Sequence, residues 1–122
     1  MAADVLLYAD IRGIETHGVS NMLRGYVKSF GEGGINPNPK IKTIREMGAV
    51  ATIDSDGGHG LVVGPYAMNM AIKKAKQFGI GSVTAMNGRH FGAAAYHAAM
   101  ALDHDMIGMA MTTGGMNVVP VD

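Results

Sequence analysis

Two of the five histidines in this 122-residue sequence have neighbours that suit them to proton transfer. His90 lies within Asn87-Gly88-Arg89-His90-Phe91-Gly92, between a predicted strand and a predicted helix. Loops at the carboxyl ends of strands are favoured places for active sites. The positive end of a helix disfavours imidazolium, so the ring of His90 would stay neutral and able to accept a proton near pH 7. A loop histidine that bonds only to backbone is the alternative, and the motif alone leaves both open.

The second histidine, His17, opens a predicted helix and follows Thr16, a suitable N-cap. His17, Asn21, Arg24 and Lys28 recur at i, i+4, i+7 and i+11 on the polar face of that helix. A guanidinium holds a carboxylate through two hydrogen bonds, so Arg24 with Asn21 could bind an acidic substrate that His17 also contacts. A solvated helix face has the same composition, and spacing alone does not separate the two interpretations.

Two other patterns fail as binding motifs. The segment Gly58-His59-Gly60-Leu61-Val62-Val63-Gly64 resembles a dinucleotide fingerprint, but its third glycine comes one residue late. No Asp or Glu occurs between residues 57 and 102 to bind a ribose, so a standard Rossmann site is not expected. His90, His97 and His104 recur every seven residues, about 10.5 Å apart on a helix. Zinc ligands each lie about 2 Å from the metal, and no metal site is predicted.

The hydrophobic pattern predicts the elements that position these residues. Helices are predicted at Ala2–Ile11, from His17 to Phe30, from Pro65 to Phe78, and at Ala93–Leu102. In the third of these, Pro65 suits the first turn and Gly79 ends the helix. Strands are predicted at Ile41–Met47, Val50–Asp54, Ile80–Met86 and Met106–Thr112, the last two buried. The apolar faces comprise Val19, Met22, Leu23, Tyr26, Val27 and Phe30 in the second helix, and Met68, Ala71, Ile72, Ala75 and Phe78 in the third.

This alternation predicts an α/β fold with a mixed or parallel sheet under helical cover, preceded by amino-terminal helices. We assign residues 1–39 to a helical segment and residues 40–122 to a partial α/β domain. Because the sequence ends directly after a predicted strand, we expect the natural protein to continue, and the isolated stretch to be inactive.

The composition excludes several classes of function. Lys plus Arg equals Asp plus Glu at 10 each, so no charge excess indicates nucleic acid or anionic membrane as a partner. The sequence has no cysteine, which removes disulfides and thiolate chemistry and favours a reducing compartment such as the cytoplasm. Apolar windows are shorter than the roughly 20 residues that span a bilayer, and residues 1–10 lack the basic start of a signal peptide.

Several motifs together resemble one enzyme family. They are Asp10-Ile11-Arg12-Gly13, Thr16-His17-Gly18-Val19-Ser20, Gly34-Ile35-Asn36-Pro37, His90-Phe91-Gly92-Ala93-Ala94 and Met106-Ile107-Gly108-Met109-Ala110-Met111-Thr112. In this order, over nearly the whole chain, they resemble the type-2 malate/L-lactate dehydrogenases, which include ureidoglycolate dehydrogenase and 2,3-diketogulonate reductase. Members of that family are substantially longer than this sequence.

The resemblance implies hydride transfer between NAD or NADP and a small 2-hydroxy or 2-oxo acid, on a non-Rossmann mixed-sheet fold. It also implies a homodimer with the active site near the subunit contact. His17 and His90 match the family's two proton-transferring histidines. Asn21 stands where many members have a substrate-binding arginine, and Tyr26 lies one residue further from His17 than the usual family tyrosine.

The remaining site assignments follow from this resemblance and from the helical spacing. Thr16, Asn21 and Arg24 are the predicted substrate-binding residues, and Thr112, Thr113 and Gly114 are the predicted cofactor contacts. A non-enzymatic module that binds a ligand through the turn at residues 57–64, or that only oligomerises, is the alternative. The enzyme hypothesis predicts the side chains of His17 and His90 within about 10 Å in a common cleft, whereas the alternatives predict them far apart.

Overall fold

The computed structural model describes residues 2–114. Its helices are α1 (Ala2–Ile11), η1 (Glu15–His17), α2 (Val19–Gly31), α3 (Gly60–Phe78), α4 (Ala94–Ala99) and η2 (Leu102–His104), and its strands are β1 (Lys42–Met47), β2 (Val50–Asp54) and β3 (Ser82–Met86). The predictions at Ala2–Ile11 and Val50–Asp54 are confirmed in full, and the other strands and helices of the predicted α/β alternation are confirmed with shifted ends as far as α4.

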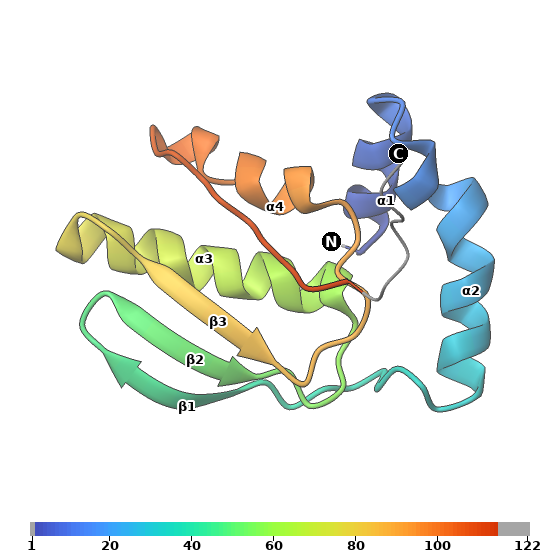
Figure 1. The fold of residues 1–122 in the computed structure, drawn as a ribbon, viewed down its shortest axis with the longest axis horizontal. Coiled ribbons are helices and arrows are strands. Elements are labelled where there is room, and N and C mark those ends of the chain that lie inside the picture. Colours follow the sequence, from blue (N-terminus) through green and yellow to red (C-terminus); the bar gives the residue numbers. More distant parts are fainter. Residues whose placement is uncertain (1, 115–122) are drawn as a thin grey trace, which may run out of the picture.

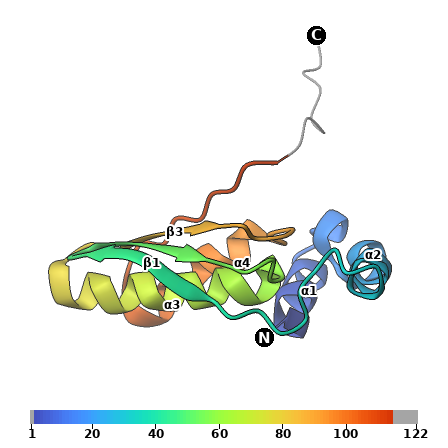
Figure 2. The same ribbon diagram turned by 90° about the horizontal axis from the view of Figure 1, so that it is seen from below.

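The three strands form one mixed sheet, as predicted, and their order is β1-β2-β3. β1 pairs antiparallel with β2, and β2 pairs parallel with β3 in the register Val50↔Ser82 to Asp54↔Met86. The helix α3 connects the two parallel strands, and α3 and α4 lie on the same face of the sheet (Figures 1 and 2). Along β2, Ala51 and Ile53 are buried while Val50 is 46% exposed, so in the described part only one face of the sheet is covered.

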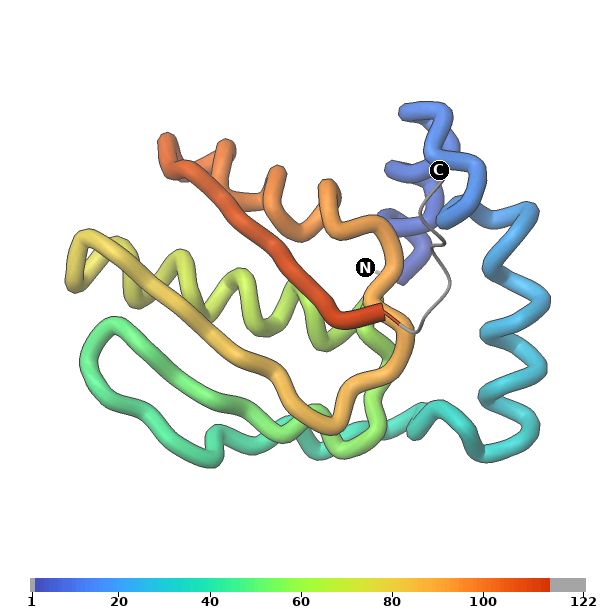
Figure 3. The backbone as a smooth tube through the Cα atoms, viewed as in Figure 1, coloured from blue at the N-terminus to red at the C-terminus, as the bar shows by residue number. Residues whose placement is uncertain are grey.

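The helical pair α1 and α2 lies at the end of the sheet toward which β2 and β3 point (Figure 3). Val5, Leu6 and Ala9 of α1 are buried in one hydrophobic cluster with Leu61 at the start of α3 and Ala93 before α4. Burial of an aliphatic side chain of this size contributes roughly 1.5–3 kcal/mol. This cluster spans the boundary predicted after residue 39 and holds the amino-terminal helices against the first turn of α3.

Helix α3 begins five residues earlier than predicted. Its N-cap is His59, and Pro65 lies inside the helix, where it removes one internal hydrogen bond and the helix continues past it. Gly79 ends the helix in the left-handed conformation at φ 80°, as predicted. Phe78, predicted to be buried, is 46% exposed.

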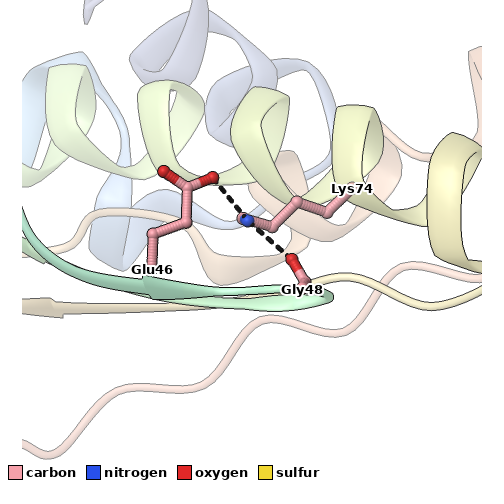
Figure 4. A network of polar contacts seen from close by, with 3 residues as sticks. All are labelled: Glu46, Gly48 and Lys74. Carbon is pink, nitrogen blue, oxygen red and sulfur yellow. Dashed lines mark hydrogen bonds and ion pairs between the residues drawn. The ribbon is translucent and has the colours of Figure 1, made fainter.

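The carboxyl-terminal half of α3 is fastened to the β1–β2 hairpin by a buried lysine (Figure 4). Lys74 Nζ donates to Glu46 Oε1 at 2.7 Å and to the carbonyl oxygen of Gly48 at 2.8 Å. Lys74 is 6% exposed whereas the Glu46 side chain is 57% exposed, so the ammonium group is buried and the carboxylate remains open to water. Together the two bonds hold the helix across the hairpin turn.

Two strand predictions are wrong in part or in full. The strand predicted at Met106–Thr112 is not formed: these residues run extended without pairing, and Ile107, Met109 and Met111 are largely exposed. An apolar run becomes a strand only beside a strand with free backbone groups, and here Gly108 lies against the Ala98 carbonyl of α4 instead. The strand predicted as buried at Ile80–Met86 is present as β3 but mostly exposed, because helices cover it on one face only.

The helix predicted at Ala93–Leu102 is present as the shorter α4 followed by η2. Among the described residues no helix is both long and apolar enough to cross a membrane.

Candidate active site

The rings of His17 and His90 lie next to each other, as the enzyme hypothesis predicts. Their centroids are 5.5 Å apart and the ring planes differ by 20°, so the rings are stacked. His17 ends η1, and His90 lies in the loop between β3 and α4. Both are partly open to solvent on the surface between the amino-terminal helices and that loop. A hollow of about 470 Å³ lies elsewhere, beside Lys73 and Phe78 at the far end of α3.

Both histidines use the same ring nitrogen to bond the protein. His17 Nδ1 is 2.9 Å from Thr16 Oγ1, and His90 Nδ1 is 2.7 Å from the phenolic oxygen of Tyr26. No hydrogen bond to either Nε2 is formed within residues 2–114. Each ring therefore has its orientation fixed at Nδ1 and its other nitrogen available to a bound molecule.

The surroundings keep His90 neutral. Burial, and then the nearby ring of His17, lower the pKa of His90 below the usual histidine value. The sequence predicted the same direction from a helix terminus, but α4 starts four residues later and is short, so desolvation is the stronger cause. Burial also raises the pKa of Tyr26 to about 12, which keeps its phenol protonated.

Two residues of the site were not predicted from the sequence. Tyr26 was assigned to the apolar face of α2, and its ring is indeed 6% exposed, but its hydroxyl reaches His90. A buried tyrosine needs a partner for its hydroxyl, which is the signal that could have found it. His59 was counted only as part of a glycine pattern, yet its ring contacts Tyr26 edge-on at 4.2 Å between centroids.

The short element that carries His17 is held by side chains of both amino-terminal helices. The N-cap of α2 is Gly18, and the predicted cap Thr16 lies in η1 instead, where it bonds to His17. The Asp10 carboxylate accepts the N–H of Val19 at 3.0 Å, so α1 supplies the cap of α2.

Of the three predicted substrate-binding residues, one forms a hydrogen bond with a site histidine and, within residues 2–114, two do not. Thr16 lies in the site through its bond to His17. Asn21 points back to η1, where its Nδ2 donates to the Glu15 carbonyl oxygen. Arg24 is exposed on α2, and within the described residues it forms no hydrogen bond or ion pair with His17 or His90. The predicted row on one helix therefore does not extend to His17, which precedes α2.

The predicted cofactor contacts Thr112, Thr113 and Gly114 lie in the extended segment at the end of the described chain, and all three are exposed.

The glycine-rich turn before α3 is filled by protein. A Cβ at Gly60 would lie 2.3 Å from the carbonyl oxygen of His90, and one at Gly58 would lie 2.8 Å from that of Ser55. The backbone of the His90 loop and that of Ser55 therefore pack directly against these two glycines. In the described range no group of His, Asp and Glu side chains could hold a metal ion.

The comparison with known proteins agrees with this geometry. Residues 1–122 match the family model for malate/L-lactate dehydrogenase over their whole length. The chain belongs to this family.

Curated members of the family are similar over almost the whole chain. The malate dehydrogenase of Pyrococcus horikoshii is 49% identical over 120 residues, which cover 98% of this chain and 33% of that protein. The L-sulfolactate dehydrogenase of Methanocaldococcus jannaschii is 45% identical over 112 residues, 92% of this chain and 32% of that protein. The ureidoglycolate dehydrogenase of Escherichia coli O157:H7 is 33% identical over 118 residues, 97% of this chain and 34% of that protein. The chain thus spans about a third of the length of these malate/L-lactate dehydrogenase relatives.

Solved structures of the malate/L-lactate dehydrogenase family share the fold. The malate dehydrogenase from Pyrococcus horikoshii superposes with a TM-score of 0.82 at 50% identity, covering 84% of this chain and 29% of that one. The sulfolactate dehydrogenase from Methanocaldococcus jannaschii superposes with a TM-score of 0.83 at 45% identity, covering 86% of this chain and 30% of that one. These matches confirm the predicted family and the mixed-sheet α/β fold with amino-terminal helices.

Proposed function

We propose that this chain forms the proton-transfer part of an oxidoreductase that moves a hydride between NAD or NADP and a small 2-hydroxy or 2-oxo acid. The observation that carries the proposal is the stacked pair of His17 and His90, each bonded at Nδ1 and open at Nε2. Relatives named malate, sulfolactate and ureidoglycolate dehydrogenase support the substrate class. Because the chain spans a third of their length, the activity is proposed for the whole protein.

In the oxidation direction, His90 Nε2 accepts the proton of the substrate's 2-hydroxyl group. The C–H bond at the same carbon breaks, its electron pair leaves as hydride, and the C–O single bond becomes a carbonyl. The product is a 2-oxo acid, and His90 becomes imidazolium. In the reverse direction the imidazolium returns the proton to the carbonyl oxygen as negative charge develops there. The lowered pKa of His90 suits it to the role of a base near neutral pH.

The neighbours of His90 assist without exchanging electrons. Tyr26 stabilises the imidazolium because its oxygen can accept a hydrogen bond from Nδ1–H, and its raised pKa keeps the phenol from ionising. His17 is proposed to hydrogen-bond the substrate oxygen or a relaying water through Nε2, with Thr16 holding the ring. Arg24, exposed and without an ion pair to either histidine, is proposed to reach the substrate carboxylate.

The nicotinamide supplies the chemistry that these side chains lack. His90 supplies the proton acceptor, and the nicotinamide would supply the hydride acceptor. The exposed hydroxyls of Thr112 and Thr113 are proposed to contact the cofactor, together with parts of the whole protein outside the described residues. We also propose that the protein works as a homodimer in the cytoplasm.

The test is an assay of the whole protein with malate, lactate and sulfolactate, each with NAD and with NADP. Succinate, which has two carboxylates but no hydroxyl, is the control. We expect reduction of the nicotinamide with at least one 2-hydroxy acid and none with succinate. Absence of turnover with every 2-hydroxy acid and 2-oxo acid, in both directions, would contradict the proposal.

A further inference from the structure

The ring of His59 is fixed by the start of α3. His59 is the N-cap, and its Nδ1 accepts the backbone N–H of Leu61 at 3.0 Å. Nδ1 is therefore the unprotonated nitrogen and Nε2 carries the proton. The residue is 5% exposed, so the ring cannot turn without losing the cap and disturbing the packing around it.

Two aromatic side chains of α2 hold the same ring. Tyr26 meets it edge-on, with centroids 4.2 Å apart and planes at 85°. Phe30, one helical turn further along α2, stacks with it at 5.7 Å and 17°. The His59 ring therefore packs directly against the Tyr26 ring, and Phe30 contacts the same imidazole.

The residue after His59 supports the other partner of the Tyr26–His90 bond. At Gly60 the backbone of residues 89–91 approaches so closely that a Cβ would lie 2.3 Å from the His90 carbonyl oxygen. Consecutive residues at the beginning of α3 therefore set the position of Tyr26 on one side and of His90 on the other. The bond of 2.7 Å between them depends on both supports.

His59 supports Tyr26 as a neutral ring. Burial, and then the nearby His90, lower the pKa of His59 to about 4. The titratable groups that face it are Tyr26 from α2 and His90 from the loop after β3. Since Tyr26 is a neutral phenol near pH 7, the three rings meet there without a permanent charge.

We propose that His59 is a positioning residue of the active site: its ring fixes Tyr26, and Tyr26 holds Nδ1 of His90 so that Nε2 faces the substrate. This inference rests on the proposed function as far as catalysis is concerned. Its structural part, the control of the His90 ring by His59, stands apart from any activity.

If His59 only caps α3, its ring should not matter for catalysis; if it positions Tyr26, the ring should matter. Two substitutions in the whole protein distinguish these two roles. His59→Asn keeps an oxygen that accepts the Leu61 N–H but removes the ring. His59→Phe keeps a ring of similar size but removes the cap. His104→Asn makes the same chemical change at an exposed histidine on η2, away from the site, and is the matched control.

We expect His59→Asn to lower kcat by roughly 10- to 100-fold, the range for a misplaced catalytic group, with little change in KM. The melting temperature should also fall, because loss of the buried ring leaves a cavity. The pH profile of kcat/KM should shift, and the ¹⁵N chemical shifts of the His90 ring should show a changed tautomer mixture. His59→Phe should retain kcat and the His90 tautomer while melting at a lower temperature. His104→Asn should match the natural protein.

A folded His59→Asn protein with natural kcat, pH profile and His90 tautomer would overturn the inference. The inference would also be overturned if a folded His59→Phe protein lost as much kcat as His59→Asn and showed the same change in the His90 tautomer. If the natural protein turns over no 2-hydroxy acid, the proposed function fails, but the chemical shifts of His90 still decide whether His59 controls its ring.

Discussion

The hydroxyl of Tyr26 and Nδ1 of His90 are joined at 2.7 Å although 64 positions separate them in the sequence. This bond connects the amino-terminal helices to the loop that follows the parallel sheet. The bond occupies Nδ1 and leaves Nε2 of His90 available for proton transfer. The reactive imidazole therefore lies where the amino-terminal helices meet the loop after β3.

Replacement of His90 by alanine should reduce turnover of a 2-oxo acid with NAD(P)H by about 10²- to 10⁴-fold, the usual contribution of a positioned acid or base. The Kd of the cofactor should change much less, because no described residue near His90 forms a cradle for it. Steady-state kinetics and a cofactor titration measure the two effects. His104→Ala, on the exposed η2, serves as control, and near-normal turnover by His90→Ala, together with loss of turnover by His17→Ala, would show that His17 is the principal acid or base.

The pH dependence should respond to the stacked partner of His90. Its lowered pKa means that His90 stays neutral, and able to act as a base, at pH values somewhat below 6.5. The acid limb of kcat/KM for oxidation should therefore lie below that of an ordinary histidine. His17→Phe removes the smaller of the two causes, so the limb should move to higher pH, whatever happens to the maximal rate. A limb that stays in place or moves to lower pH would contradict this electrostatic coupling.

The close contact at Gly60 predicts a sensitive position. Gly60→Ala would push the backbone of residues 89–91 away from α3, with a cost of about 1–3 kcal/mol, as for other overpacked sites. Turnover should fall together with stability because His90 moves from Tyr26. Gly25→Ala is a matched control, since Gly25 lies in α2 with nothing within 4 Å of its would-be Cβ. Alanine there should stabilise the helix by roughly 0.5–1 kcal/mol; thermal unfolding compares the two variants.

Acid should destabilise the protein through His59. Its pKa is about 4 in the folded protein and returns to the ordinary 6.5 on unfolding. Between these values the unfolded chain binds a proton that the folded chain does not. The free energy of unfolding is therefore unaffected by the titration of His59 above pH 6.5. As the pH falls from 6.5 toward 4, it decreases by on the order of 1.4 kcal/mol per pH unit. Denaturant unfolding from pH 4 to 8 should show a shallower dependence in His59→Phe, and an unchanged slope would contradict the prediction.

Asn21 and Arg24 should differ in kinetics although they share a helix. Arg24→Ala should raise the KM of the acid substrate with little effect on kcat, because a carboxylate contact is present in ground and transition states alike. Asn21→Ala instead removes the bond to the Glu15 carbonyl and loosens η1, so it should lower kcat through His17. An unchanged KM in Arg24→Ala would move the carboxylate site to another part of the protein.

The sequence was sufficient for the elements whose pattern is local. Helix α1, the amphipathic α2 and the end of α3 at Gly79 follow from helical periodicity and from glycine's preference for the left-handed conformation. The pairing of His17 with His90 was predicted through the family resemblance, since neither spacing nor composition relates residues so far apart.

What the sequence could not provide depends on neighbours distant along the chain. The start of α3 was misplaced because Pro65 is a familiar first-turn residue, and this hid the capping role of His59. The strand at residues 106–112 was predicted from its apolar composition, but pairing requires a partner edge, which no local pattern reveals. Arg24 and Asn21 were grouped by helical facing, and only coordinates show that Asn21 bonds to the turn before the helix.

The contacts of Val5, Leu6 and Ala9 of α1 with Leu61 and Ala93, which are part of the hydrophobic cluster, make the site sensitive to local opening. His17 and Tyr26 belong to the helices on one side of these contacts, and His90 belongs to the loop on the other. If the helices detach while the sheet and α3 remain folded, the molecule keeps most of its regular structure but has no paired histidines. Local opening of this kind requires less free energy than global unfolding. Catalytic competence should therefore disappear ahead of secondary structure under mild stress, and the fraction of docked helices sets the fraction of molecules that can react.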